Sequence, residues 1–266
     1  MQRESLVNEV RELGPWFHQI DLGDGVLTRG ISASPGPQPV DHPLPRWHKI
    51  KDVLPADMHG MYVLDIGCSD GFFSFEMARR GARVLAMDAA RKAVQRMRWT
   101  QRRLGIHGIE ARSGDLYSFD KGITRYDRLR HWFRRRLWMV SNALSFGKAE
   151  PLDYVPRRFD LVFMFAVLYH VKEPLTALER LAPLADVLLI ETVAVDDAQH
   201  SHLEYQPPKA GVTHEPKWFP TTRCLQDMLR WAGYAEVRQI ADASDRRPIY
   251  LAYKQGADLS KWNLPK

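Results

Sequence analysis

The stretch Met61–Gly71, MYVLDIGCSDG, predicts the fold of the whole chain. Its first half is a short apolar run that ends on an acid, which is typical of a buried strand. Its second half is a loop with glycines at 67 and 71, and residues 72–80 after it have helical composition. Glycine lets the backbone approach a ligand, and the first turn of a helix offers N–H groups without a partner inside the helix. A strand, a glycine-rich turn and a helix in this order predict a nucleotide-type pocket.

The spacing of the loop residues indicates which nucleotide. A dinucleotide fingerprint requires G-x-G-x-x-G, whereas the pattern here is acid-x-Gly-x-Ser-x-Gly, formed by Asp65, Gly67, Ser69 and Gly71. A carboxylate at a strand end suits an ammonium group, because a phosphate beside Asp65 would be repelled. S-adenosyl-L-methionine carries such an ammonium at its methionine end. We therefore predict that it is the cofactor.

Acids also end the next two expected strands. Asp88 closes the run ARVLAMD about 20 residues further on, where an acid can accept hydrogen bonds from ribose hydroxyls. Asp115 ends the third run, IEARSGDL, and is placed to meet an adenine amino group. We include Ala89 and Leu116, next to these acids, among the predicted donor-binding residues. Three acids at successive strand ends are a more specific pattern than one glycine loop.

Several motifs resemble a known family. DIGCSDG, MDAA, GDLYS and FDLVFMFAVLYHVKEPL look like a class I S-adenosylmethionine-dependent methyltransferase. Within that superfamily, VLYHVKEPL, WHKIKDVLP and KWFPTTRCLQDMLRWAGY resemble the bacterial tRNA wobble-uridine carboxymethyltransferases. The resemblance covers Trp47 to Lys254 apart from a central insertion. It implies that Tyr169 and Arg247 help to anchor the donor. The family's middle loop glycine is Ser69 here, which is small enough to keep the turn.

One departure from that family concerns the donor. In the family, a Pro-Trp pair is followed by Arg and Lys, and the Lys contacts the extra carboxylate of a carboxylated S-adenosylmethionine. Here Pro15 and Trp16 are followed by Phe17 and His18. A neutral histidine is a weak substitute for an ammonium in holding a carboxylate. We therefore expect methyl donation, with carboxymethyl donation as the alternative.

The order of expected elements predicts an α/β fold, a Rossmann-like seven-stranded class I methyltransferase domain. Strands and helices alternate, and near-continuous apolar strands indicate a parallel sheet covered on both faces. The last two strands, 234–240 and 248–254, would form an antiparallel edge hairpin. We divide the chain into an N-terminal helix and lid segment at 1–46, the methyltransferase domain at 47–254 and a tail at 255–266. A basic, amphipathic helical insertion is expected at 117–158, between strands three and four.

Composition places the chain among ordinary globular proteins. It has 266 residues, 45% hydrophobic and 26% charged, which suits one domain with additions. The charged N-terminus resembles neither a signal peptide nor a membrane span. Two lone cysteines fit a reducing compartment, so we expect a cytoplasmic protein. His200 and His202, with two acids nearby, match no ligand template, and we predict no metal.

The positive charge is concentrated locally. Residues 121–136 hold seven basic residues and one acid, and removing them from the totals of 38 and 32 leaves 31 of each sign. Residues 91–103 hold six basic residues and no acid. Such segments suit a polyanion, here tRNA, although a solvated helix face is the alternative for 91–103. The 117–158 insertion has three interpretations: a helix packed on the sheet, a peripheral membrane helix, or a clamp for tRNA.

The expected chemistry is methyl transfer to a hydroxyl or amine. Tyr169 and His170 follow the fourth strand and would lie beside the methyl group, with His170 as a candidate base or a structural histidine. The acceptor is a tRNA wobble uridine, or a small molecule, lipid or sugar. A non-catalytic RNA- or membrane-binding module is a further alternative. Intact acids at all three strand ends argue against it.

Overall fold

The structure is a computed structural model of the chain. It describes residues 2–36, 38–114, 116, 158–208, 216–241 and 246–264. The predicted insertion at 117–158 and the site residue Asp115 lie outside the described residues, apart from Arg158. Among the described residues, no helix has the length and apolar composition needed to cross a membrane.

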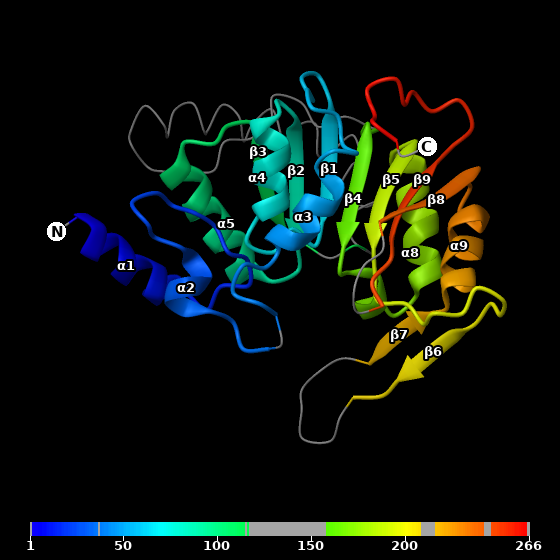
Figure 1. The fold of residues 1–266 in the computed structure, drawn as a ribbon, viewed down its shortest axis with the longest axis horizontal. Helices are drawn as coiled ribbons and strands as arrows, with labels where there is room; N and C mark the ends of the chain where they lie inside the picture. Colours follow the sequence, from blue (N-terminus) through cyan, green and yellow to red (C-terminus); the bar gives the residue numbers. More distant parts are fainter. Residues whose placement is uncertain are drawn as a thin grey trace.

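A seven-stranded sheet forms the centre of the protein (Figure 1). Its strand order is β3-β2-β1-β4-β5-β9-β8. The first five of these strands are parallel, β9 runs antiparallel to β5, and β8 and β9 form the predicted edge hairpin. The strands are β1 (Tyr62–Ile66), β2 (Arg83–Asp88), β3 (Ile109–Ser113), β4 (Leu161–Phe165), β5 (Val187–Glu191), β8 (Glu236–Ala241) and β9 (Ile249–Tyr253). The predicted fold class is confirmed.

Two hydrophobic cores lie on the two faces of the sheet. Alternation along β1 explains this, because Val63 packs in one core while Leu64 packs in the other. Helices α3 (Leu44–Ile50), α4 (Phe72–Arg79) and α5 (Arg91–Leu104) contribute to the first core. Helices α8 (Pro174–Leu181) and α9 (Thr222–Trp231) contribute to the second. Between α8 and β5 runs a short 3-10 helix, η2 (Ala182–Leu184).

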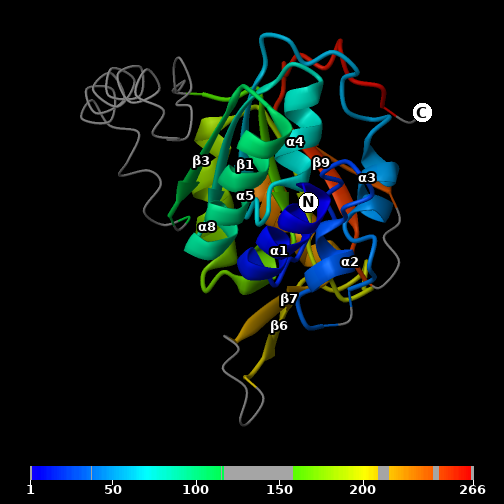
Figure 2. The same cartoon turned by 90° about the vertical axis from the view of Figure 1, so that its left-hand side faces the viewer.

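The N-terminal segment packs against the first core. Helix α1 (Gln2–Leu13) buries Leu6 and Val10, and the short helix α2 (Thr28–Ser32) follows a turn. Figure 2 shows both helices beside α5 at one end of the sheet. In the sequence, the Gly-Asp-Gly turn within 17–28 predicts two short strands around it, and the structure shows that this prediction is wrong. The turn at Gly23–Gly25 closes only the isolated bridge between Asp21 and Leu27, and α2 begins at the next residue.

The C-terminal tail also joins the first core. Trp262 is buried there, and the backbone N–H of Asn263 donates to the carbonyl of Val53 at 3.2 Å. Burying a large aromatic side chain stabilises the fold by about 2 kcal/mol or more. The tail therefore holds the segment before β1 in place.

A two-stranded ribbon projects below the sheet (Figures 1 and 2). It consists of β6 (Leu203–Gln206) and β7 (Lys217–Pro220), which pair antiparallel. Tyr205 and Trp218 are direct cross-strand partners, and their ring centroids lie 5.0 Å apart. The sequence analysis did not predict this ribbon.

Candidate active site

The loop after β1 is tied to the end of β2. The N–H groups of Gly67 and Cys68 both donate to the carbonyl of Met87, at 2.8 and 3.0 Å. Gly71, the N-cap residue of α4, has φ of 95°, a conformation that favours glycine. A Cβ at Gly71 would also lie 2.6 Å from Cγ of Met97. Gly67 also has a positive φ, of 78°, so the turn favours glycine at both ends.

Ser69 occupies a strained position in the same loop. Its φ is 47°, in the left-handed region that is uncommon for residues with a side chain. Its N–H donates to Oδ2 of Asp88 at 2.8 Å. That charge-assisted hydrogen bond stabilises the turn, so serine replaces glycine without opening the loop.

Asp88 lies at the C-terminal end of β2 and organises two loops. Its Oδ1 accepts from the N–H of Ala90 at 2.7 Å, while Oδ2 accepts from Ser69. Burial raises the pKa of this carboxyl. Each carboxylate oxygen can accept a second hydrogen bond. Asp88 is thus placed to take hydroxyl donors from a ligand lying between the two loops.

Asp65 is more deeply placed than the sequence suggested. It is 2% exposed, and its Oδ2 accepts from the hydroxyl of Ser74 at 2.5 Å. Burial, and to a lesser extent the charge of Asp88, raises the pKa of Asp65 to about 7 despite that hydrogen bond. A cation nearby would relieve this cost, whereas an anion would increase it. The acids at the strand ends therefore fit a positively charged ligand.

Asp70 is a residue that the sequence analysis missed. It is fully buried, and its Oδ2 accepts from the backbone N–H groups of Phe17 at 2.6 Å and His18 at 2.9 Å. Its Oδ1 accepts from Nε of Arg96 at 2.6 Å. This carboxylate joins the N-terminal segment to the loop after β1. Its position within the DIGCSDG motif was visible, but its partners are 26 to 53 residues away.

His18 is buried and neutral. Its Nδ1 accepts from the N–H of Phe72, at 3.3 Å, and the residue is 4% exposed. Burial and the charges of Arg46, Arg29 and Arg96 lower its pKa to about 3. Burial, followed by the charges of His18, Arg46, Arg29 and Arg247, lowers the pKa of His42 to about 2. His18 is therefore uncharged under physiological conditions.

A second polar group lies on the other side of the edge, at the ends of β4, β5 and β9. Tyr169 belongs to a 3-10 helix, η1 (Leu168–His170). Arg247 donates from Nη2 to its hydroxyl at 3.2 Å and from Nη1 to Oε1 of Glu191 at 3.1 Å. Nε of Arg46 lies 3.7 Å from the same Glu191 oxygen. The structure thus brings together the predicted Tyr169 and Arg247.

Glu191 completes this group, although the sequence analysis did not select it. It is fully buried, and its Oε2 has no hydrogen-bond partner among the described residues. Glu191 ends the strand-forming run VLLIE, so its place at the edge was predictable while its role was not. An anionic oxygen without a partner fits a cationic ligand better than an anionic one.

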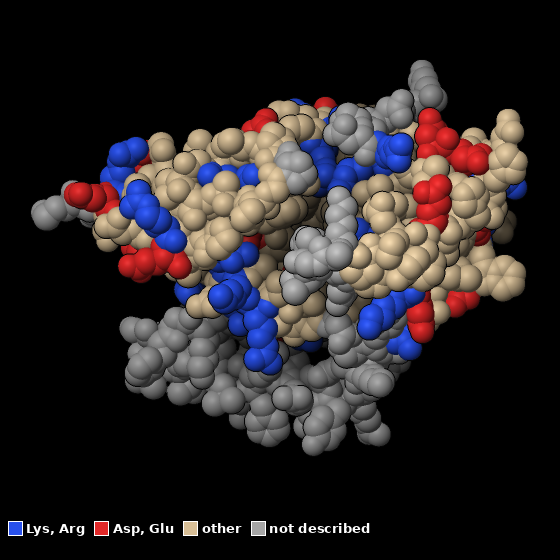
Figure 3. Space-filling model, turned by 90° about the horizontal axis from the view of Figure 1, so that it is seen from below, with Lys and Arg blue, Asp and Glu red and all other residues tan. Residues whose placement is uncertain are grey.

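The remaining predicted residues are spread along this edge. Ala89 is exposed after β2, Leu116 is half-buried after β3, and His170 is exposed at the end of η1, with its ring centroid 4.2 Å from that of Tyr169. Figure 3 looks onto this edge and shows basic side chains around the hollowed middle of the face. The described residues contain no group of three side chains suited to a metal ion.

The strand order of this sheet, together with the acids that could bind a ligand at its C-terminal edge, defines a class I methyltransferase. The chain belongs to the methyltransferase domain family, whose model matches residues 43–242. The prediction of a class I, S-adenosylmethionine-dependent methyltransferase is thereby confirmed as a statement of family and fold.

Curated relatives carry a more specific name. The chain is 28% identical over 198 residues to the tRNA U34 carboxymethyltransferase of Azotobacter vinelandii, covering 73% of this chain and 50% of that protein. It is 24% identical over 202 residues to the corresponding protein of Desulfotalea psychrophila, covering 74% and 52%. The chain therefore spans about half the length of the curated relatives it matches.

Solved structures show the same fold. The N-terminal domain of EvdMO1, solved in the presence of SAH and D-fucose, aligns with a TM-score of 0.63 at 16% identity. The alignment covers 96% of this chain and 98% of that one. An S-adenosylmethionine-dependent methyltransferase from Mesorhizobium loti aligns with a TM-score of 0.52 at 16% identity, covering 79% and 97%.

Proposed function

We propose that the chain binds S-adenosylmethionine at the C-terminal edge of β1, β2 and β4 and transfers its methyl group. The observation that carries the proposal is the position of Asp88. Its carboxylate holds Ser69 of the first loop and Ala90 of the second, and its oxygens remain able to accept ligand hydroxyls. Raised pKa values at Asp65 and Asp88 support a cationic ligand between these loops.

Each part of the donor can be matched to residues at the C-terminal edge of the sheet. Asp88 would hold the ribose, and the turn of Gly67–Gly71 would face the methionine end. Asp65 would act on the ammonium through its charge, because its carboxylate is bonded to Ser74 and buried. Tyr169, whose hydroxyl accepts a hydrogen bond from Arg247, would lie on the other side of the edge, after β4. When bound, the donor supplies an electrophilic methyl group on a sulfonium.

A methyl donor fits the site better than a carboxymethyl donor. By resemblance, carboxymethyl transfer uses a lysine at the position of His18, and this histidine is neutral and engaged with the N–H of Phe72. The guanidinium of Arg247 is already paired with Glu191. Neither residue offers an uncompensated positive charge to a second carboxylate.

The proposed acceptor is a uridine in tRNA. Support comes from the name of the curated relatives and from the basic residues of 91–103. Positioning of acceptor and donor would supply most of the acceleration, since the transfer is a direct displacement. His170 is exposed at the end of η1, where it could take a proton from the acceptor. We also expect the protein to act in the cytoplasm.

Labelled methyl transfer tests this function. Purified protein would be incubated with S-adenosylmethionine carrying a tritiated methyl group, and with tRNA or a panel of free sugars as acceptor. The proposal predicts label in tRNA. Label in a sugar would keep the methyltransferase and overturn the acceptor, and native mass spectrometry showing a carboxylated donor bound would overturn the choice of donor.

A further inference from the structure

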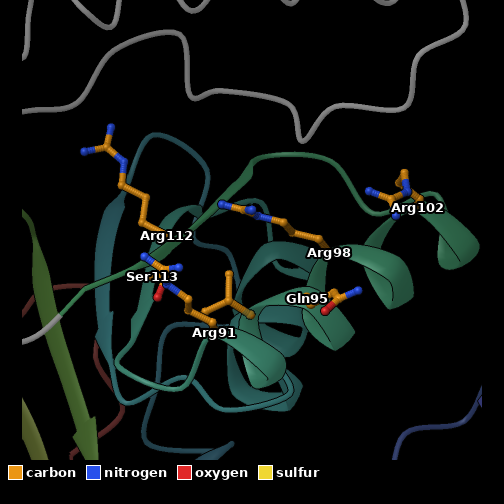
Figure 4. A pocket seen from close by; sticks show the side chains of 7 residues that line it. Arg91, Gln95, Arg98, Arg102, Arg112 and Ser113 are labelled. Atoms are coloured by element: carbon orange, nitrogen blue, oxygen red, sulfur yellow. The ribbon is translucent and has the colours of Figure 1, made fainter. Parts of the chain in front are cut away.

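A basic groove lies between helix α5 and the end of strand β3 (Figure 4). The groove has a volume of about 570 Å³ and is open to solvent on one side. Its lining contains four arginines and no acid. The arginines are Arg91, Arg98, Arg102 and Arg112, and the other lining residues are Val94, Gln95 and Ser113. It lies outside the group of Asp65, Asp88 and Tyr169 described above.

Helical spacing places three of these arginines in one row. Arg91, Arg98 and Arg102 are separated by seven and four residues, so they project from the same face of α5. The row is about 16 Å long, from the rise of 1.5 Å per residue. Figure 4 shows Arg91 and Arg98 reaching from α5 toward β3, with Arg112 extending from the strand.

The groove is held in shape by its own contacts. Arg98 donates from Nε and Nη2 to the carbonyl of Ala111, at 3.1 and 2.5 Å. Nε of Arg112 donates to Oε1 of the buried Glu110 at 2.8 Å. Arg91 and Arg102 at the two ends are exposed. Two arginines are thus fixed before a ligand binds, which lowers the entropy cost of binding.

We propose that this groove binds the phosphate backbone of RNA. Because this inference assigns a binding surface to the proposed acceptor, it rests on the proposed function. Guanidinium groups match phosphate geometry, and a row of about 16 Å can follow more than one phosphate of a strand. A membrane surface would need apolar side chains on the same face, and the only aliphatic side chain in the lining is Val94.

The position of the groove connects it with the donor edge. Ser113, at one end of the groove, is the register partner of Asp88 in the β2–β3 pair. Arg91 begins α5 only three residues after Asp88. An RNA strand lying in the groove would therefore lead to the loop where the proposed donor binds.

Charge reversal on two faces of α5 tests the proposal. The variant Arg91→Glu/Arg102→Glu changes the ends of the groove. The matched control Lys92→Glu/Arg103→Glu makes the same change in charge at exposed residues of the same helix that lie outside the groove lining, roughly 100° around the helix axis. The probe is a fluorescein-labelled tRNA transcript, and its anisotropy is followed against salt concentration with the full chain.

The groove variant is expected to weaken RNA binding about tenfold or more and to lower the slope of log affinity against log salt by about 1 to 2. The control should change affinity by less than about threefold. Equal losses in both variants, or no loss in either, would overturn the proposal. Vesicles of phosphatidylglycerol that bind the wild type but not the groove variant, with RNA binding unchanged, would assign the groove to membranes.

A parallel titration keeps this test separate from the proposed function. S-adenosylmethionine binding is expected to be the same in the groove variant and the wild type, because the lining residues are not those of the donor edge. Loss of donor binding in the wild type would end the proposed function and leave the RNA result standing. Loss of RNA binding only in the groove variant, with donor binding intact, would support both.

Discussion

Arg96 and Asp70 form a buried ion pair that joins helix α5 to the loop after β1. Nε of Arg96 lies 2.6 Å from Oδ1 of Asp70, and the two side chains are 11% and 0% exposed. The other oxygen of Asp70 accepts from the N–H groups of Phe17 and His18. One carboxylate therefore connects the N-terminal segment, the loop and α5.

Breaking this pair should destabilise the fold. Arg96→Met leaves Asp70 without its cation in a buried site, which typically costs about 3 to 5 kcal/mol of the free energy of unfolding. Urea denaturation would measure the change. Arg103→Met, an exposed change on the same helix, should stay within about 0.5 kcal/mol of the wild type. A loss below 1 kcal/mol for Arg96→Met would show that the pair contributes little.

Asp70→Asn should loosen the N-terminal segment selectively. An amide oxygen is uncharged, and the hydrogen bonds from Phe17 and His18 lose their charge-assisted strength. Hydrogen exchange followed by mass spectrometry should show faster exchange in peptides that cover residues 16–20. Peptides from β4, at the centre of the sheet, should exchange as in the wild type. Unchanged protection at 16–20 would contradict this role of Asp70.

Asp65 should make stability depend on pH. Its pKa is about 7 in the folded protein and about 4 in the unfolded chain. Between these values the folded state binds more protons, so the contribution of Asp65 to the free energy of unfolding falls as pH rises from about 4 to about 7. Below this window its contribution is complete, and above it the loss is constant.

The variant Asp65→Asn removes the titrating carboxyl group while keeping an oxygen that can accept the hydrogen bond from Ser74. The difference in free energy of unfolding between variant and wild type should shift in favour of the variant as pH rises from about 4 to 7, by a few kcal/mol. Taking the difference cancels the opposite effects of the neutral His18 and His42. A difference that does not vary with pH would contradict the raised pKa.

The sheet could be predicted from the sequence because its signals are local. The runs that form α5 (Arg91–Leu104) and β3 (Ile109–Ser113) can be recognised from their own residues. Apolar runs, glycine at 67 and 71 and the acids at 65 and 88 can each be recognised from the residues next to them in the sequence. These features placed the loop and strand ends of the candidate site.

The parts that sequence did not predict depend on distant partners. Asp70 looked like a loop acid, and only folding brings Phe17 and Arg96 to it. The six basic residues of 91–103 look alike in sequence, but the fold turns Arg96 inward and leaves Arg91 and Arg102 in the groove. The Gly-Asp-Gly turn within 17–28 suggested two strands, yet the segment closes with the isolated bridge between Asp21 and Leu27.

Arg247 and Glu191 should be coupled energetically. Glu191 is fully buried, so Arg247→Met leaves a charge whose remaining ion pair within the described part of the chain is with Arg46, at 3.7 Å. We expect a loss of about 3 kcal/mol in the free energy of unfolding. In the double variant Arg247→Met/Glu191→Gln the buried charge is gone, and at least 1 kcal/mol should be recovered. Additive losses in this double-mutant cycle would show that the two residues are independent.

The most direct test of the account is a calorimetric titration of the purified protein with S-adenosylmethionine. Wild type should bind one donor per chain, and Asp88→Asn should weaken binding about tenfold or more, equal to about 1.4 kcal/mol. The control Glu236→Gln, at an exposed position of edge strand β8, should bind as the wild type does. Absence of binding to the wild type, or equal affinity in the wild type and Asp88→Asn, would contradict the placement of the donor at this edge.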